Sequence, residues 1–226
     1  MNWIDSGYLV SKNKYNENSI IAEVYTKNHG KYSGIIFGAS SIKIKNYLQI
    51  GNSLHINYSS KNENKIGFFK VEIIKALTPL YFDQSKKLMC IASAMNLIKF
   101  LTVEAQENIK IYDLISKLFI ILNDKDWIKK YIFWELEFFK FIGYDLELKK
   151  MVKEVFIDDR KEYYVQFNEH KKKIPNFLID DHLDNIDNQT LIQGLRLVGD
   201  FLEKTILKPN NINFPTSRLD FVNILK

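Results

Sequence analysis

Lysines are concentrated in the first third of the chain, and their ammonium groups are suited to binding phosphate. Residues 1–76 contain ten lysines, no arginine and five acidic residues. This balance of +5 equals the formal net charge of the whole chain, so the remaining residues are neutral in sum. Lysines that neutralise phosphates release condensed counterions, which gives affinity for nucleic acid without sequence preference. The pattern predicts a polyanion-binding N-terminal module; the alternative is that these lysines only keep the domain soluble.

The candidate contacts are lysines expected at turns and loops, with one tyrosine that could stack on an unpaired base. The absence of arginine favours contact with the backbone over bidentate reading of bases. The predicted DNA-binding residues are Lys12, Lys14, Lys27, Lys31, Lys43, Lys45 and Tyr47.

Catalytic motifs are missing from the sequence. No glycine-rich phosphate loop ends in Gly-Lys-Ser/Thr, and neither G-x-S-x-G nor H-E-x-x-H occurs. The single cysteine, Cys90, lies in an apolar stretch, and the four histidines have no metal-ligand spacing. We therefore predict that the protein is not an enzyme and has no cofactor. An enzyme with an unrecognised pocket is the least favoured alternative.

The first third has the pattern of a small β-barrel. Candidate strands separated by glycine or asparagine turns are Trp3–Ser11, Ser19–Thr26, Tyr32–Phe37, Ser53–Tyr58 and Ile66–Ile74. Apolar and polar side chains alternate in the last two of these, as in half-buried strands. Closing five short strands into a barrel removes exposed sheet edges.

After Pro79 the apolar period changes from two to between three and four, which indicates helices. Expected helices cover 88–101, 111–123, a segment from Asp126 to Gly143, a segment around 191–206, and a last helix after Pro215 capped by Thr216 or Ser217. A β-hairpin is expected at about 154–167, with its turn at Asp158–Lys161. The predicted fold is α+β, with a five-stranded barrel domain at 1–77 and a helical domain at 78–226.

Targeting signals are also missing. The first residues lack the basic and apolar regions of a secretion signal, and no apolar run approaches the roughly 20 residues of a spanning helix. These features predict a soluble, cytoplasmic protein without membrane contact.

Taken in order, the motifs of the chain resemble those of the RecO family of bacterial recombination mediators. The first are Trp3-x-Asp5-x-Gly7-Tyr8-x-Val10 and Tyr15-x-Glu17-x-Ser19-x-Ile21, followed by Gly30, Gly34, Gly38-Ala39 and Leu48-Gln49-x-Gly51. The later ones are Tyr112-Asp113-Leu114-Ile115, the segment from Tyr131 to Leu148, and Pro215-x-x-Arg218. Together these motifs follow the family's order over nearly the whole chain.

The resemblance implies an oligonucleotide/oligosaccharide-binding (OB) barrel followed by a helical domain. It implies binding of single- and double-stranded DNA, annealing of complementary strands, and help in loading RecA onto DNA coated by single-stranded DNA-binding protein (SSB). The implied partners are RecR and the acidic C-terminal tail of SSB, and the implied location is the bacterial cytoplasm at the nucleoid. A protein-interaction adaptor that does not bind DNA is the main alternative.

Two departures from the family pattern bear on the sites. Many members carry zinc-ribbon cysteines where this chain has Met151 and the hairpin, so we predict no zinc. The basic pair often found around Gly38-Ala39 is replaced by Phe37 and Ser40, which leaves Lys43 and Lys45 as the nearest basic residues. For a partner protein the candidates are Trp127, Lys129, Lys130 and Tyr131; the alternative is that this helix face is core with a solvated rim. The sequence assigns RecR to no surface and leaves the oligomeric state open.

Overall fold

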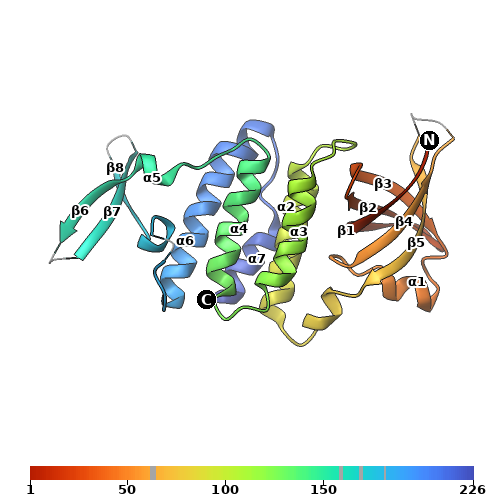
Figure 1. Cartoon of the computed structure of the whole chain (residues 1–226), viewed down its shortest axis with the longest axis horizontal. Coiled ribbons are helices and arrows are strands. Elements are labelled where there is room, and N and C mark those ends of the chain that lie inside the picture. The colour runs from red at the N-terminus through yellow and green to blue at the C-terminus, as the bar shows by residue number, and fades with distance from the viewer. Residues whose placement is uncertain (62–64, 158–159, 168–169, 181) are drawn as a thin grey trace. The chain divides into compact units, whose positions relative to one another are not determined.

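The computed structural model describes residues 1–61, 65–157, 160–167, 170–180 and 182–226 (Figure 1). The chain folds as two compact units. One contains residues 1–123 and 215–221, and the other contains residues 124–214 and 222–226. The first unit thus extends beyond residue 77, and the predicted division into domains at 1–77 and 78–226 remains a proposal.

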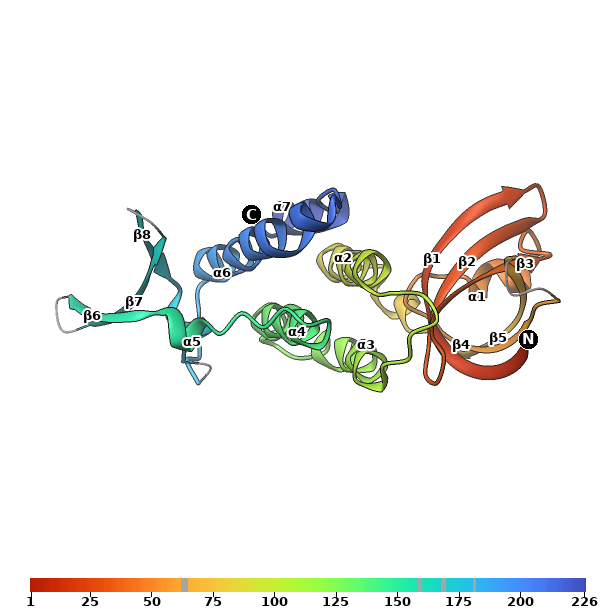
Figure 2. The same ribbon diagram turned by 90° about the horizontal axis from the view of Figure 1, so that it is seen from above.

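The first unit contains a closed five-stranded barrel (Figure 2). Its strands are β1 (Asn2–Asn16), β2 (Ser19–Thr26), β3 (Gly30–Phe37), β4 (Ser53–Ser59) and β5 (Gly67–Lys75). They pair in the order β1-β2-β3-β5-β4 and back to β1, with β3 and β5 parallel and all other neighbours antiparallel. Helix α1 (Ile42–Tyr47) connects β3 to β4. This is the arrangement of an OB-type barrel, as the sequence predicted.

Alternation along each strand fills the barrel with apolar side chains. Buried members of this core are Leu9, Ala22, Val24, Ile36, Leu54, Ile56, Tyr58, Phe69 and Val71. Two glycines make room for the rings where β3 meets β5: Gly34 pairs with Gly67. A Cβ at Gly34 would lie 2.6 Å from the Phe69 ring, and one at Gly67 would lie 2.4 Å from the Tyr58 ring. The parallel junction that closes the barrel therefore requires these two small residues.

Lys31 joins the barrel to helix α2 (Ser85–Leu101). Its side chain is buried, and Nζ donates hydrogen bonds to Lys99 O at 2.5 Å and Thr102 O at 2.6 Å. These carbonyls belong to the last turn of α2 and its cap, where no further helical amide can reach them. Burial lowers the pKa of Lys31, an effect that Glu23 and Glu104 oppose.

We expect Lys31→Met to lower the free energy of unfolding by about 2 kcal/mol, because two buried carbonyls lose a charged donor. Urea unfolding followed by circular dichroism measures this change. Lys27→Met, at an exposed position in the neighbouring turn, is the control and should have an effect within about 0.5 kcal/mol. Equal stability of the two variants would show that Lys31 does not hold α2 to the barrel.

Asp5 organises the turn between β2 and β3. Its carboxylate accepts hydrogen bonds from Ser6 N at 2.8 Å, Asn28 N at 2.8 Å and Asn28 Nδ2 at 2.9 Å, and His29 Nδ1 lies 2.9 Å from Oδ2. The Trp3 ring stacks between His29 and Tyr58, with centroid distances of 4.2 and 4.7 Å. This network fixes the turn against the end of the barrel core.

The rest of the first unit is helical. It contains a 3-10 turn (Thr78–Tyr81), α2, α3 (Ile109–Ile121) and the first residues of α7 (Thr216–Leu225). The α7 segment contacts α2 through Asn96 Nδ2, which donates to Ser217 Oγ at 2.9 Å. Helix α7 begins at Thr216, so Thr216 and Ser217 are the first two residues of the helix. The N-cap position lies one or two residues before those predicted.

The second unit combines helices with a small sheet. Its elements are α4 (Trp127–Phe141), α5 (Leu148–Met151), β6 (Lys153–Ile157), β7 (Arg160–Phe167), β8 (His170–Ile174), a 3-10 turn (Asn176–Leu178), α6 (Asn188–Phe201), a π-helix (Leu202–Leu207) and a 3-10 turn (Lys208–Asn210). Gly143, at φ +94°, ends α4 in the left-handed conformation that the sequence predicted. The expected hairpin is present as β6 and β7; the part of its turn at Asp158–Asp159 lies outside the described residues. Strand β8, which the sequence did not predict, pairs with β7 and extends the hairpin to three strands.

Candidate nucleic-acid interface

Helix α1 forms where a loop was predicted, and it closes one end of the barrel. Ser41 caps its N-terminus by accepting a hydrogen bond from Ile44 N at 3.4 Å. At the other end Asn52 Nδ2 donates to Tyr47 O at 3.1 Å. Ile44 and Tyr47, three residues apart and on one helix face, pack against the barrel core. The opposite face is therefore in solvent.

Lys43 and Lys45, two residues apart and so on different sides of α1, flank its buried face. Both side chains are exposed, and neither has a carboxylate partner among the residues that the structure describes. Tyr47, the predicted stacking residue of this segment, is half-buried because its ring packs on the core. Its position favours a role in holding α1 to the barrel over a role in contacting bases.

Lys12 on β1 lies close to Lys45 on α1. Its Nζ donates a hydrogen bond to Leu48 O, the C-terminal cap of α1, where a cation is favoured by the helix dipole. Burial lowers the pKa of Lys12, and repulsion from the Lys45 ammonium lowers it further. A phosphate between these two ammonium groups would relieve that repulsion.

Lys14 projects from the hairpin that joins β1 to β2. The structure extends β1 to Asn16, so Lys12 and Lys14 lie on a strand where a turn was expected. The tip of the hairpin contacts the connection before α1, since Ala39 N donates to Asn18 O at 3.1 Å and Ser40 Oγ to Asn18 Oδ1. Hairpin and helix thus bring Lys12, Lys14, Lys43 and Lys45 to one end of the barrel, which we call the basic end.

The other two predicted lysines lie at the opposite end of the barrel. Strand β2, with eight residues, separates the β1–β2 hairpin from the turn at Lys27 by about 25 Å. Lys27 is exposed there, whereas Lys31 is buried and bonded to the end of α2. The structure therefore does not gather all the predicted residues into one surface. Lys31 in particular is unavailable to a phosphate.

Few carboxylates lie at the basic end. Within the described part of the chain, Lys14 has no ion-pair partner, as is also true of Lys43 and Lys45. Glu17 is exposed in the turn of the hairpin, and Asp5 and Glu23 are engaged elsewhere, with His29 and Lys99 respectively. Phosphate oxygens could therefore approach the ammonium groups of Lys14, Lys43 and Lys45 without displacing a carboxylate.

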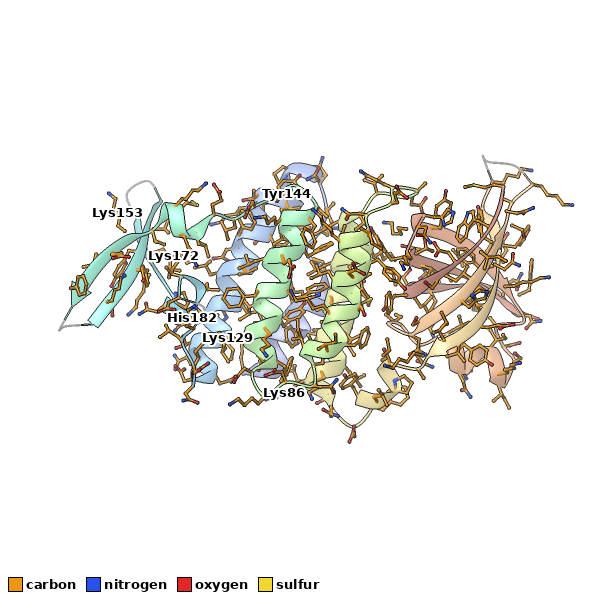
Figure 3. The ribbon with its side chains drawn as sticks, viewed as in Figure 1. Lys86, Lys129, Tyr144, Lys153, Lys172 and His182 are labelled. Atoms are coloured by element: carbon orange, nitrogen blue, oxygen red, sulfur yellow. The ribbon has the colours of Figure 1, made fainter. Side chains whose placement is uncertain are left out.

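The predicted partner-protein site lies at the start of α4. Tyr131 is fully buried and stacks on Trp134 at a centroid distance of 5.7 Å, so its assignment to a docking surface was wrong. Trp127 is half-buried, and Lys130 pairs with Asp124. Lys129 Nζ donates to Leu183 O at 2.7 Å, beside His182 (Figure 3). A pocket of about 140 Å³ borders Lys129, with Lys125, Asp126, Ile128, Asp184 and Ile186 also in its lining.

Metal ligands are not gathered in the described residues, where no cluster of three or more His, Cys, Asp or Glu side chains could hold an ion. Cys90 is buried in α2. The hairpin region contains no cysteine, so its residues do not fit a zinc ribbon. Within the described part of the chain no helix has the length and apolar character needed to cross a membrane.

Comparisons with known proteins cover both parts of the chain. Residues 1–77 match the family model "Recombination protein O N terminal", and residues 83–211 match "Recombination protein O C terminal". The chain is 28% identical to the DNA repair protein RecO of Wolbachia sp. subsp. Drosophila simulans (strain wRi), covering 96% of this chain and 98% of the relative. It is 30% identical to the DNA repair protein RecO of Rickettsia canadensis, with 93% and 91% covered. The chain belongs to the RecO family of DNA repair proteins.

Proposed function

We propose that this protein binds single- and double-stranded DNA through the basic end of its barrel, anneals complementary strands, and helps load RecA onto SSB-coated DNA. The observation that carries the proposal is the meeting of Lys12, Lys14, Lys43 and Lys45 at one end of an OB-type barrel in a RecO-family chain. Barrels of this type bind oligonucleotides at surfaces bounded by their loops.

The proposed mechanism is electrostatic and needs no bond to be made or broken. Two complementary strands repel each other through their phosphates, and this repulsion limits how often they meet in a productive register. Ammonium groups at the basic end neutralise phosphates and release counterions. Lowered repulsion raises the frequency of pairing, so the protein acts as a mediator and not as an enzyme.

The family suggests SSB and RecR as partner proteins, and the second unit offers a candidate surface for one of them. For the acidic tail of SSB we propose Trp127, Lys129 and Lys130 at the start of α4, because Lys129 borders a pocket whose lining combines apolar side chains with a second lysine, Lys125. Asp126 and Asp184 also line the pocket, so an acidic peptide would have to approach from the lysine side. RecR is a proposed partner without an assigned surface. The site of action would be the bacterial cytoplasm at the nucleoid.

A strand-annealing assay with naked and SSB-coated complementary oligonucleotides tests this proposal. We expect the protein to accelerate annealing of both, with the acceleration falling as salt rises because counterion release weakens. Accelerated annealing of naked strands alone would remove the SSB assignment. If neither reaction is accelerated and oligonucleotides show no salt-sensitive binding, the chain is a protein adaptor. Assays for nuclease activity and nucleotide hydrolysis should remain at background.

A further inference from the structure

Two large aromatic side chains lie exposed on the outer surface of the barrel. Phe37 at the end of β3 is 60% exposed, and Phe68 on β5 is 38% exposed. Their rings stack, with centroids 5.3 Å apart and planes at 24°. We call this pair the aromatic platform.

Strand alternation explains why these rings point outward. Their neighbours Ile36 and Phe69 are buried in the barrel core, at 2% and 3% exposure. Consecutive side chains on a strand point to opposite faces, so Phe37 and Phe68 face out. Burial of the barrel core does not account for these two exposed phenylalanines, and with Ile66, which is 41% exposed, they enlarge the apolar surface at this place. Contiguous exposed apolar surface is typical of interaction sites.

The surroundings of the aromatic platform are positively charged. Phe37 directly precedes Gly38 and the connection to α1, which places it beside the basic end. On the neighbouring strand Phe37 pairs with Ser19, whereas Lys14, in register with Ile20 and the inward-facing Ile36, lies on the opposite face of the sheet. On β5, Lys70 follows Phe68 by two residues and therefore lies on the same outer face. Among described residues Lys70 has no ion-pair partner, so the charge on this face favours an anionic ligand.

We propose that Phe37 and Phe68 form a stacking platform for unpaired bases of a single nucleic-acid strand, while Lys70 and the neighbouring basic end hold its phosphates. This inference rests on the proposed DNA binding and deepens it. Phenylalanine has no hydrogen-bonding group, so the platform would accept any base through its π-face. Bases in a duplex are already stacked and paired, so the platform selects single strands over duplexes.

The test compares the Phe37→Ala/Phe68→Ala double variant with wild type on three fluorescent probes. These are an oligothymidylate of about 15 nucleotides, an abasic strand of the same length, and a duplex of the same length. We expect affinity for the oligothymidylate to fall by roughly tenfold or more. Affinity for the abasic strand and the duplex should change by less than about twofold, and the salt slope should not change, because no cation is removed.

Two further variants separate stacking from folding. Phe82→Ala removes an equally exposed phenylalanine (59%) of the same unit outside the barrel, and should bind every probe as wild type does. Phe37→Leu/Phe68→Leu keeps apolar bulk but removes the π-face, so it should reproduce the loss on oligothymidylate with unchanged thermal stability. Retention of wild-type affinity by the leucine variant would overturn the platform.

The remaining outcomes also decide between the proposals. An equal loss on all three probes overturns base stacking. A wild-type dimer that the alanine variant converts to monomers in sedimentation would assign the aromatic platform to contact between two copies of the chain and overturn the inference. If wild type binds none of the probes in a salt-dependent way, the proposed function itself fails. Wild-type binding with a normal salt slope, combined with no effect of the variants, rejects the platform alone.

Discussion

Replacing both Lys43 and Lys45 with glutamate is expected to weaken oligonucleotide binding at least tenfold at low salt and to flatten its salt dependence. Two phosphate contacts are removed, which should lower the slope of log affinity against log salt by roughly 1.4 units on single strands and 1.8 on duplexes. The effect extends beyond two contacts, because a glutamate at position 45 would attract the neighbouring Lys12 ammonium. Filter-binding titrations at several salt concentrations measure both quantities.

A matched control for this charge reversal is Lys86→Glu with Lys204→Glu. Both lysines are exposed and lie outside the barrel, so the net charge changes equally without touching the basic end. Its slope should stay within error of wild type. Equal flattening in both double variants would mean that overall charge, and not the basic end, drives binding. A third variant, Lys27→Glu, tests whether the opposite end of the barrel contributes a separate contact.

The largest expected effect on stability comes from Asp5→Ala. Two backbone amides, the Asn28 side chain and the His29 ring lose their shared acceptor in a buried site. We expect the free energy of unfolding to fall by about 3 kcal/mol, because buried donors left unpaired are costly. Urea unfolding followed by tryptophan fluorescence measures this change in stability. Trp3 is a suitable probe because its ring stacks on His29, a member of the Asp5 network.

The control for Asp5 is Asp83→Ala, an exposed acid of the same unit, which should change stability by less than about 0.5 kcal/mol. At temperatures where Asp5→Ala remains folded, its oligonucleotide affinity should match wild type, because the network lies at the end of the barrel opposite the basic end. A stable Asp5→Ala variant would contradict the role assigned to this network.

Much of the barrel could be predicted from the alternation of apolar and polar side chains along its strands. Strand β2 was predicted to the residue at Ser19–Thr26, and β4 was one residue short. Helix α1 was missed because Ile42-Lys43-Ile44-Lys45 alternates like a strand, and six residues are too few for a helical period to emerge. Its formation depends on the Ser41 cap and on the open end of the barrel that Ile44 and Tyr47 cover. Strand β8 was missed because a lysine run has no apolar alternation.

The candidate site was harder to predict than the fold. The sequence gives the number of lysines in a segment but not which of their side chains are exposed. Lys27 and Lys31 flank the same turn, yet one is exposed and the other is buried against the end of α2. In α4 the alternative to a docking surface, that this helix face is core with a solvated rim, is correct for Tyr131, which is buried. The aromatic platform had a sequence signal in Phe68-Phe69, since only one of two adjacent strand residues can face the core.

The proposal that the basic end of the barrel is the DNA interface is tested most directly by lysine-modification footprinting. The protein is treated with an amine-reactive reagent with and without saturating oligonucleotide, and each lysine is quantified by mass spectrometry. We predict strong protection of Lys14, Lys43 and Lys45 and unchanged modification of Lys86 and Lys204. Unchanged modification at the basic end under saturating oligonucleotide, with protection at other lysines, would contradict this account.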